Sequence, residues 1–268
     1  MESLSIVSAY DEPLYYEIAF SFIDAKRQAD LFLEFAQRYS TIEVKRFLDI
    51  GCGPSLQLRE LAARGYEAIG LDSNPRMLQH LVQATASSGH RVETLCADMT
   101  DFRLDKPADF AFCMMGTIGL IESNRAFLSH LSSVAASLNP GGLYIIENMR
   151  LDWAGKRLLE PQSWTMEREG IKVETTYSVS LDDALKQTIK EELTLNVDDH
   201  GRRLVLKDSA LTKIVFPQEF LLLVELEGSF EFVGWFERDS TKRLEQARMD
   251  NIALLRRKQT PKHGQESI

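Results

Sequence analysis

The stretch Arg46–Ser55, R-F-L-D-I-G-C-G-P-S, predicts a strand, a tight turn and the start of a helix. Its first half is mostly apolar and favours a buried strand. Gly51 and Gly53 let the chain turn tightly and let a ligand lie against the backbone. Pro54 suits the first helical position, because its missing N–H would be unpaired there. The free N–H groups of the helix then face the turn, so the stretch predicts a ligand cradle.

Asp49, at the end of this strand, indicates which ligand the cradle takes. A carboxylate there would repel the pyrophosphate of a nicotinamide or flavin dinucleotide, and Leu56 stands where the dinucleotide fingerprint needs a small residue. An NAD-dependent oxidoreductase is therefore disfavoured. A carboxylate suits a cationic amino group, such as that of S-adenosylmethionine. A glycine-rich turn in another α/β protein is the alternative.

The motif L-D-I-G-C-G-P-S resembles the first motif of class I S-adenosylmethionine-dependent methyltransferases. Ser55 departs from the pattern, since many members have a third glycine there. The resemblance implies a Rossmann-like, mostly parallel α/β sheet that binds S-adenosylmethionine. It also implies cofactor contacts from four residues of the motif: Asp49, Gly51, Cys52 and Gly53.

The bulk properties exclude several classes of protein. The chain has 268 residues, 44% of them hydrophobic, which is neither a disordered nor a membrane-protein composition. The N-terminus lacks a signal-peptide pattern, and three cysteines without a C-x-x-C pair indicate reduced thiols, so we expect a cytoplasmic protein without a membrane partner. A net charge of −9 argues against nucleic acid as a partner. Five scattered histidines suggest no metal site.

Two later strands are also expected to end in carboxylates. Residues 66–71 predict a strand that ends at Asp72, about where a ribose-binding acid falls. Asp72 and Ser73, followed by N-P-R-M-L, resemble the family's second motif, and capping of the helix at 75–88 is the alternative function of Asp72. A strand at 91–97 precedes Asp98 and Met99, which the resemblance places against the adenine. An acid after a strand is otherwise a turn residue.

The fourth and fifth strands supply the remaining candidates. Residues 108–114 predict a strand that ends in M-M-G-T-I-G, where Met114 and Met115 would face the sulfonium or else fill the core. A helix at 122–138 and an N-P-G-G turn at 139–142 lead into the fifth strand. Glu147, near its end, is the candidate general base, although a strand-end glutamate is more often a surface or turn residue.

The two ends of the chain complete the expected organisation. One helix is expected over residues 13–38, within an N-terminal segment (1–40) that the resemblance implies is a lid over the cofactor. Tyr16 would reach the methionine end of the cofactor, or else it packs at the edge of the core. A helix at 54–64, capped by Gly65, follows the cradle. Alternating residues predict an antiparallel meander at 160–214, with a D-D-H-G turn at 198–201. The core domain is expected to comprise residues 41–159 and 215–260. Its second part contains a helix at 217–227 and an antiparallel hairpin of strands 229–236 and 252–256, and a tail follows at 261–268.

The function implied is methyl transfer from S-adenosylmethionine to a nitrogen or oxygen atom of a small molecule, mainly by in-line positioning. The meander resembles the insert that small-molecule methyltransferases, including amino-sugar N-methyltransferases, place over the substrate pocket. Two alternatives stay open: a protein methyltransferase, and a silent cofactor-binding scaffold that forms a homodimer through the meander. Nucleic-acid methylation is disfavoured. Amino-methylating DNA enzymes of this fold resemble one another in an N/D/S-P-P-aromatic loop after the fourth strand, and cytosine C5 enzymes need a cysteine after a proline; this sequence has neither motif. Three tryptophans are candidates for an apolar pocket lining: Trp153, Trp164 and Trp235.

Overall fold

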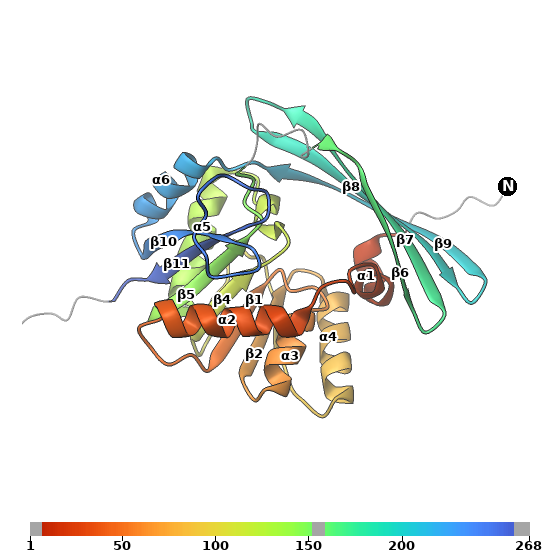
Figure 1. The fold of residues 1–268 in the computed structure, drawn as a ribbon, viewed down its shortest axis with the longest axis horizontal. Coiled ribbons are helices and arrows are strands. Elements are labelled where there is room, and N and C mark those ends of the chain that lie inside the picture. Colours follow the sequence, from red (N-terminus) through yellow and green to blue (C-terminus); the bar gives the residue numbers. More distant parts are fainter. Residues whose placement is uncertain (1–6, 152–158, 260–268) are drawn as a thin grey trace, which may run out of the picture.

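A seven-stranded sheet forms the centre of the protein, and a separate four-stranded sheet projects from it (Figure 1). The computed structural model describes residues 7–151 and 159–259. The central order is β10-β11-β5-β4-β1-β2-β3: β11 runs antiparallel to both its neighbours, β10 and β5, and the pairs from β5 to β3 are parallel. This confirms the predicted Rossmann-like sheet with its antiparallel C-terminal hairpin. The strand bounds are Arg46–Ile50 (β1), Glu67–Asp72 (β2), Glu93–Cys96 (β3), Ala108–Cys113 (β4), Leu138–Glu147 (β5), Phe230–Glu237 (β10) and Asn251–Arg257 (β11).

Helices cover both faces of the central sheet. One apolar cluster packs α2 (Ala25–Tyr39), α3 (Leu56–Ala63) and α4 (Pro75–Ser87) against one face. Another packs α5 (Asn124–Ala136) and α6 (Pro217–Glu227) against the opposite face. Because both faces are covered, the inner strands β1, β4, β5 and β11 are buried almost throughout, and ligands can reach the sheet at the carboxyl ends of its strands. Within the described ranges, no helix is long and apolar enough to cross a membrane.

The helix expected over residues 13–38 is two helices, so that prediction is wrong. A short 3-10 helix, Ala9–Asp11, leads into α1 (Pro13–Ala19), and α2 begins only at Ala25. The Asp24 carboxylate accepts the N–H of Arg27 at 3.0 Å and caps α2, which starts a new helix there. The apolar side of α1 faces the second sheet, whereas α2 packs on the core. One continuous helix could not serve both surfaces.

Two local predictions also need correction. The helix after the cradle starts at Leu56 and is capped by Ser55, whose hydroxyl accepts the N–H of Leu58, so Pro54 lies in the turn and not at the helix start. The N-P-G-G segment lies inside β5, where a register shift relative to β4 occurs. A Cβ at Gly142 would lie 2.5 Å from the carbonyl oxygen of Asp109, so Gly142 lets β5 approach β4 closely.

The insertion is an antiparallel meander, as predicted. Its strands are β6 (Gln162–Arg168), β7 (Ile171–Asp183), β8 (Thr188–Asp199) and β9 (Arg202–Lys213), paired in that order. The N–H of Gly201 bonds to the Asp198 carboxylate at 2.8 Å and closes the predicted turn. Figure 1 shows α1 between this sheet and the core. The insertion therefore stands beside the carboxyl ends of the central strands.

Candidate functional site

The glycine turn after β1 is open at Gly53 and closely packed at Gly51. Gly51 and Gly53 have φ values of +68° and +51°, a region that side chains rarely adopt. A Cβ at Gly51 would lie 2.5 Å from the Thr117 methyl carbon of a short 3-10 helix, Thr117–Leu120, whereas one at Gly53 would meet nothing within 4 Å. The Cys52 thiol is buried beneath the turn, so this residue offers a ligand its backbone.

Asp49 is a buried carboxylate without a cationic partner among the described residues. Only 3% of the residue is exposed, and its Oδ2 accepts the Ser55 hydroxyl at 2.6 Å. Burial raises the pKa of Asp49 to about 7, because the charged form loses water; the negative charge of Asp72 adds to this, and the Ser55 hydrogen bond opposes it. A cation placed beside Asp49 would stabilise the charged form of this carboxylate.

Asp72 lies across the turn from Asp49, at the end of β2. Its two carboxylate oxygens accept the N–H groups of Gly53 (2.7 Å) and Asn74 (2.8 Å). Burial raises its pKa even though these bonds, and one from the N–H of Ser73, act to lower it. The cap of α4 is Asn74, whose side chain accepts the N–H of Arg76. Asp72 thus fixes the cradle without serving as the cap.

The loop after β3 is ordered by different means. Asp98 is exposed and accepts both the N–H and the hydroxyl of Thr100 at 2.7 Å, which is the local bonding of a turn residue and lowers its pKa. The Met99 carbonyl accepts Nδ1–H of His130 at 2.8 Å, while His130 Nε2 accepts the Tyr144 hydroxyl at 2.7 Å. Burial lowers the pKa of His130 to about 4, so it stays neutral. No sequence motif marks His130 as the anchor of this loop.

The two methionines that follow β4 have different surroundings. Met114 is buried in the core, whereas Met115 is 41% exposed, has a φ of +57° and lines a cavity. The N–H of Met115 donates to Oε2 of Glu147 at 2.7 Å. Glu147 is only 3% exposed and lines the same cavity. Burial raises its pKa against the Met115 hydrogen bond.

This cavity, of about 580 Å³, lies between the carboxyl ends of β4 and β5, the N-terminal helices and the insertion. It brings Tyr16, Met115 and Glu147 together. One wall is a chain of rings: Tyr10–Tyr16 at 5.3 Å, Tyr16–Phe20 at 4.6 Å and Phe20–Trp164 at 5.6 Å between centroids. Trp164 is thus a cavity residue.

The other two tryptophans are not placed at the cavity. Trp235 packs in the core at 5.4 Å from Phe220. Trp153 lies outside the described residues.

Three arginines line the cavity, and none of them was predicted from the sequence. Arg150, just after β5, pairs with Glu191 of the insertion, and Arg238 pairs with Asp250 at 2.8 Å. Arg27 has no carboxylate partner among the described residues. It is therefore the available cation at the cavity, and no sequence motif marks it, because its surroundings come from distant segments.

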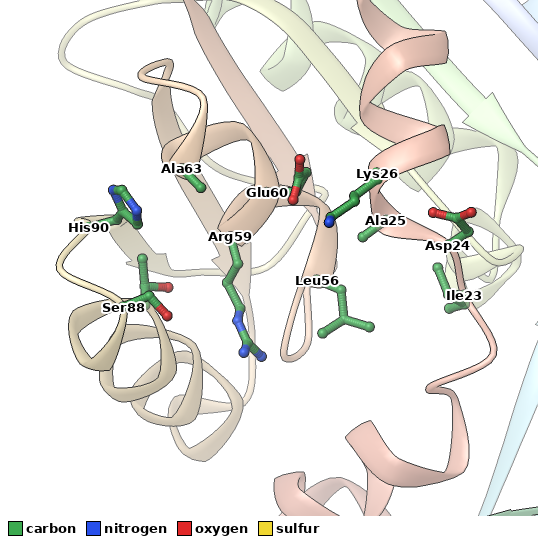
Figure 2. A pocket seen from close by; sticks show the side chains of 11 residues that line it. Ile23, Asp24, Ala25, Lys26, Leu56, Arg59, Glu60, Ala63, Ser88 and His90 are labelled. Carbon is green, nitrogen blue, oxygen red and sulfur yellow. The ribbon is translucent and has the colours of Figure 1, made fainter.

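A second, more open pocket of about 430 Å³ lies between α2, α3 and α4 (Figure 2). Lys26, Glu60 and His90 line it, and none of the predicted site residues does. Arg59 also lines it, but its guanidinium extends away from α3 and donates to Glu17 of α1 at 3.0 Å. This pocket is therefore separate from the candidate site and adjoins the contact between α1 and the core.

Residues 47–142 match a family model described as a methyltransferase domain. This segment thus carries a class I S-adenosylmethionine-dependent methyltransferase domain. The matched segment contains the glycine turn and all three strand-end aspartates. The predicted family is thereby confirmed.

Known methyltransferases resemble the chain in part or over most of its length. The tRNA U34 carboxymethyltransferase of Methylococcus capsulatus is 29% identical over 153 residues, 55% of this chain and 45% of that protein. The chain thus spans about half the length of such curated relatives. The sugar N-methyltransferase KedS8 from Streptoalloteichus has a TM-score of 0.71 at 16% identity, over 97% of this chain and 96% of that one. S-adenosylmethionine-bound CalS10, an amino pentose methyltransferase from Micromonospora echinaspora, has a TM-score of 0.69 at 19% identity, over 90% and 96%. At these identities the two structures establish the fold.

Proposed function

We propose that this protein transfers the methyl group of S-adenosylmethionine to a small-molecule acceptor in the cavity beneath the insertion. The observation that carries the proposal is the arrangement of Asp49 and Asp72 around an open glycine turn. This turn lies at the same edge of the sheet as the cavity that Glu147 lines. Cofactor and acceptor can therefore meet at the carboxyl ends of the strands.

The residues present fit the cofactor's distinct chemical groups. Asp49, buried and without a cationic partner among the described residues, suits the methionine ammonium group. Asp72 keeps acceptor capacity beyond its backbone hydrogen bonds and suits the ribose hydroxyls. Arg27 at the cavity suits the methionine carboxylate. The space at Gly53 leaves the backbone accessible.

The bound cofactor supplies a methyl group already activated by its sulfonium. The protein's task is then to hold the acceptor in line, within about 3–3.5 Å of the methyl carbon. In our proposal Glu147, held by the N–H of Met115, accepts the proton that the acceptor's nitrogen or oxygen loses. Tyr16 and its ring neighbours cover the site and keep water out.

A small acceptor is favoured over RNA by the chain's charge and by its cavity. KedS8 and CalS10, which share the fold, are named as sugar-modifying enzymes, and a walled cavity of about 580 Å³ suits acceptors of small size. The relatives named for tRNA support the second candidate. The net charge of −9 opposes it, because RNA binding relies on basic residues that contact phosphates.

The test is calorimetric titration of S-adenosylmethionine and S-adenosylhomocysteine, followed by an assay for S-adenosylhomocysteine formation with small amines, hydroxyl compounds and tRNA. We expect micromolar binding of both cofactor forms and turnover with a small acceptor. Turnover only with tRNA would select the second candidate. Binding without turnover on any acceptor would favour the scaffold alternative, and no binding by folded protein would end the methyltransferase proposal.

Glu147→Gln should lower kcat roughly 100-fold, because glutamine still accepts the N–H of Met115 but takes no proton. In the wild type, kcat/KM should rise with pH through the raised pKa of Glu147, and this rise should disappear in the variant. The affinity for S-adenosylhomocysteine should stay within about twofold, since Glu147 is assigned to the acceptor. Initial rates between pH 5 and 9 measure this, with exposed Glu122→Gln as the control. Unchanged turnover would remove Glu147 from the mechanism.

A further inference from the structure

The two sides of α1 meet their neighbours through different chemistry. Tyr15, Ile18 and Ala19 pack into an apolar cluster with residues of β7, β8 and β9 of the insertion. Among the described residues, this cluster includes no member of α3 or α4. The Trp164 indole on β6 also donates to the Ala19 carbonyl at 2.7 Å. The N-terminal segment and the insertion therefore form one apolar unit.

The same segment meets the core through polar contacts. The amide of Asn74 donates to the Tyr10 carbonyl at 2.9 Å, and Arg76 donates to the Asp11 carbonyl at 3.1 Å. Such contacts exchange with water at little cost, whereas separating apolar surfaces exposes them to water. If the two halves of the molecule separate, they should therefore part at this polar interface and not within the apolar unit.

Glu17 lies at the centre of the polar interface. Its Oε2 contacts Arg59 of α3 at 3.0 Å and Nε2 of His80 of α4 at 2.6 Å, while its Oε1 accepts from Arg168 of β6 at 2.5 Å. Only 4% of Glu17 is exposed. Burial acts to raise its pKa, but the bonds from His80 and Arg168 and the charge of Arg59 outweigh burial and lower the pKa to about 2. One buried carboxylate on α1 thus contacts both the core and the insertion.

We propose that Glu17 is a positioning residue: it docks α1 and the insertion, as one unit, on the cofactor-binding core. The adjacent residue, Tyr16, lines the cavity, so docking also sets the ring wall above the cofactor site. The contacts of Glu17 with Arg59 and His80 then break when the unit opens to admit or release ligands. This inference rests on the proposed function for what the cavity binds, but the docking itself does not depend on a ligand.

Two arginine variants separate docking on the core from packing within the unit. Arg59→Gln weakens the bond from Glu17 to the core, and Arg168→Gln weakens its bond to the insertion. Because the apolar cluster already holds α1 on the insertion, only Arg59→Gln and Glu17→Gln should loosen the unit from the core. Glu174→Gln, in an exposed pair with Lys172 on the same sheet, is the matched control.

Pulsed electron resonance can measure the distance between spin labels at the exposed positions Gln83→Cys of α4 and Thr176→Cys of β7. Cys96→Ser removes the one exposed cysteine of the described chain, since Cys52 and Cys113 are buried. We expect narrow distributions for the wild type, Arg168→Gln and Glu174→Gln. For Glu17→Gln and Arg59→Gln we expect broader distributions with a longer mean, and roughly tenfold faster S-adenosylhomocysteine dissociation by stopped flow.

Each outcome bears on the docking proposal. Wild-type distributions in both Glu17→Gln and Arg59→Gln would overturn it, and so would a broad distribution in Arg168→Gln equal to that of Arg59→Gln. Thermal unfolding of every variant identifies any that fails to fold, in which case Arg59→Gln, altered at a partly exposed residue, carries the test. Failure of the wild type to bind S-adenosylhomocysteine would end the proposed function but leave the distances interpretable.

Discussion

Asp49→Asn should make the protein more stable while it weakens cofactor binding. The pKa of Asp49 is about 7 in the folded protein and about 3.9 in an unfolded chain. Between these values the folded state binds a proton that the unfolded state does not, so the stability contributed by Asp49 falls as pH rises from about 4 to 7. Asparagine removes this cost. We expect a gain of about 1–3 kcal/mol at pH 8 that shrinks toward pH 4, measured by denaturant unfolding.

The same substitution should weaken S-adenosylhomocysteine binding roughly 100-fold, because the ammonium group loses its counter-charge. In the wild type, affinity should fall up to about tenfold per pH unit below pH 7, since Asp49 must lose its proton first. This dependence should vanish in the variant, as calorimetry at pH 5.5 to 8 will reveal. Asp109→Asn is the control: that carboxylate accepts the N–H groups of Lys45 and Arg46, so its loss should destabilise the protein and leave binding intact.

An Asp49→Asn protein with unchanged affinity and no gain in stability would assign Asp49 to the support of Ser55 alone. A gain in stability together with weaker binding would instead assign Asp49 to the ligand. A sequence that keeps a buried carboxylate at a cost to its own stability keeps it for what it binds. The stability measurement therefore tests the binding role even before an acceptor is known.

The core of the fold could be predicted because its signals are local. The cradle motif, the strand-end aspartates and the alternation of the meander each lie within a few residues. The break between α1 and α2 was missed, because the apolar residues Phe20, Phe22 and Ile23 continue the helical pattern between them. The insertion, against which α1 packs, comes more than 100 residues later in the chain. Sequence periodicity does not record which surface an apolar face will meet.

The candidate site was likewise predicted only in part, because the sequence does not show which distant residues meet on folding. The sequence predicted Glu147, at the end of the fifth strand, and Tyr16, in the first helix, and both line the cavity. It gave no signal for Arg27 or Glu17, whose importance depends on groups brought close only by folding. The sequence also did not show which of Met114 and Met115 faces the cavity, because this depends on the left-handed backbone conformation of Met115.

Asp72→Ala should weaken S-adenosylhomocysteine binding by about tenfold to a hundredfold. A charged acceptor contributes roughly 1.5–3 kcal/mol per hydrogen bond, and alanine removes the acceptors offered to the ribose. It also frees the N–H groups of Gly53 and Asn74, which should lower the thermal midpoint. Calorimetry and thermal unfolding measure the two effects.

A shortened ligand separates the function of Asp72 from that of Asp49. Methylthioadenosine keeps the ribose and adenine but lacks the amino-acid group. Asp72→Ala should therefore weaken methylthioadenosine by the same factor as S-adenosylhomocysteine, whereas Asp49→Asn should leave methylthioadenosine within about twofold of the wild type. Equal losses for both ligands in both variants would mean that the substitutions collapse the glycine turn as a whole. The crossed pattern would assign each carboxylate to its own end of the cofactor, since a general distortion of the turn cannot spare one ligand in one variant alone.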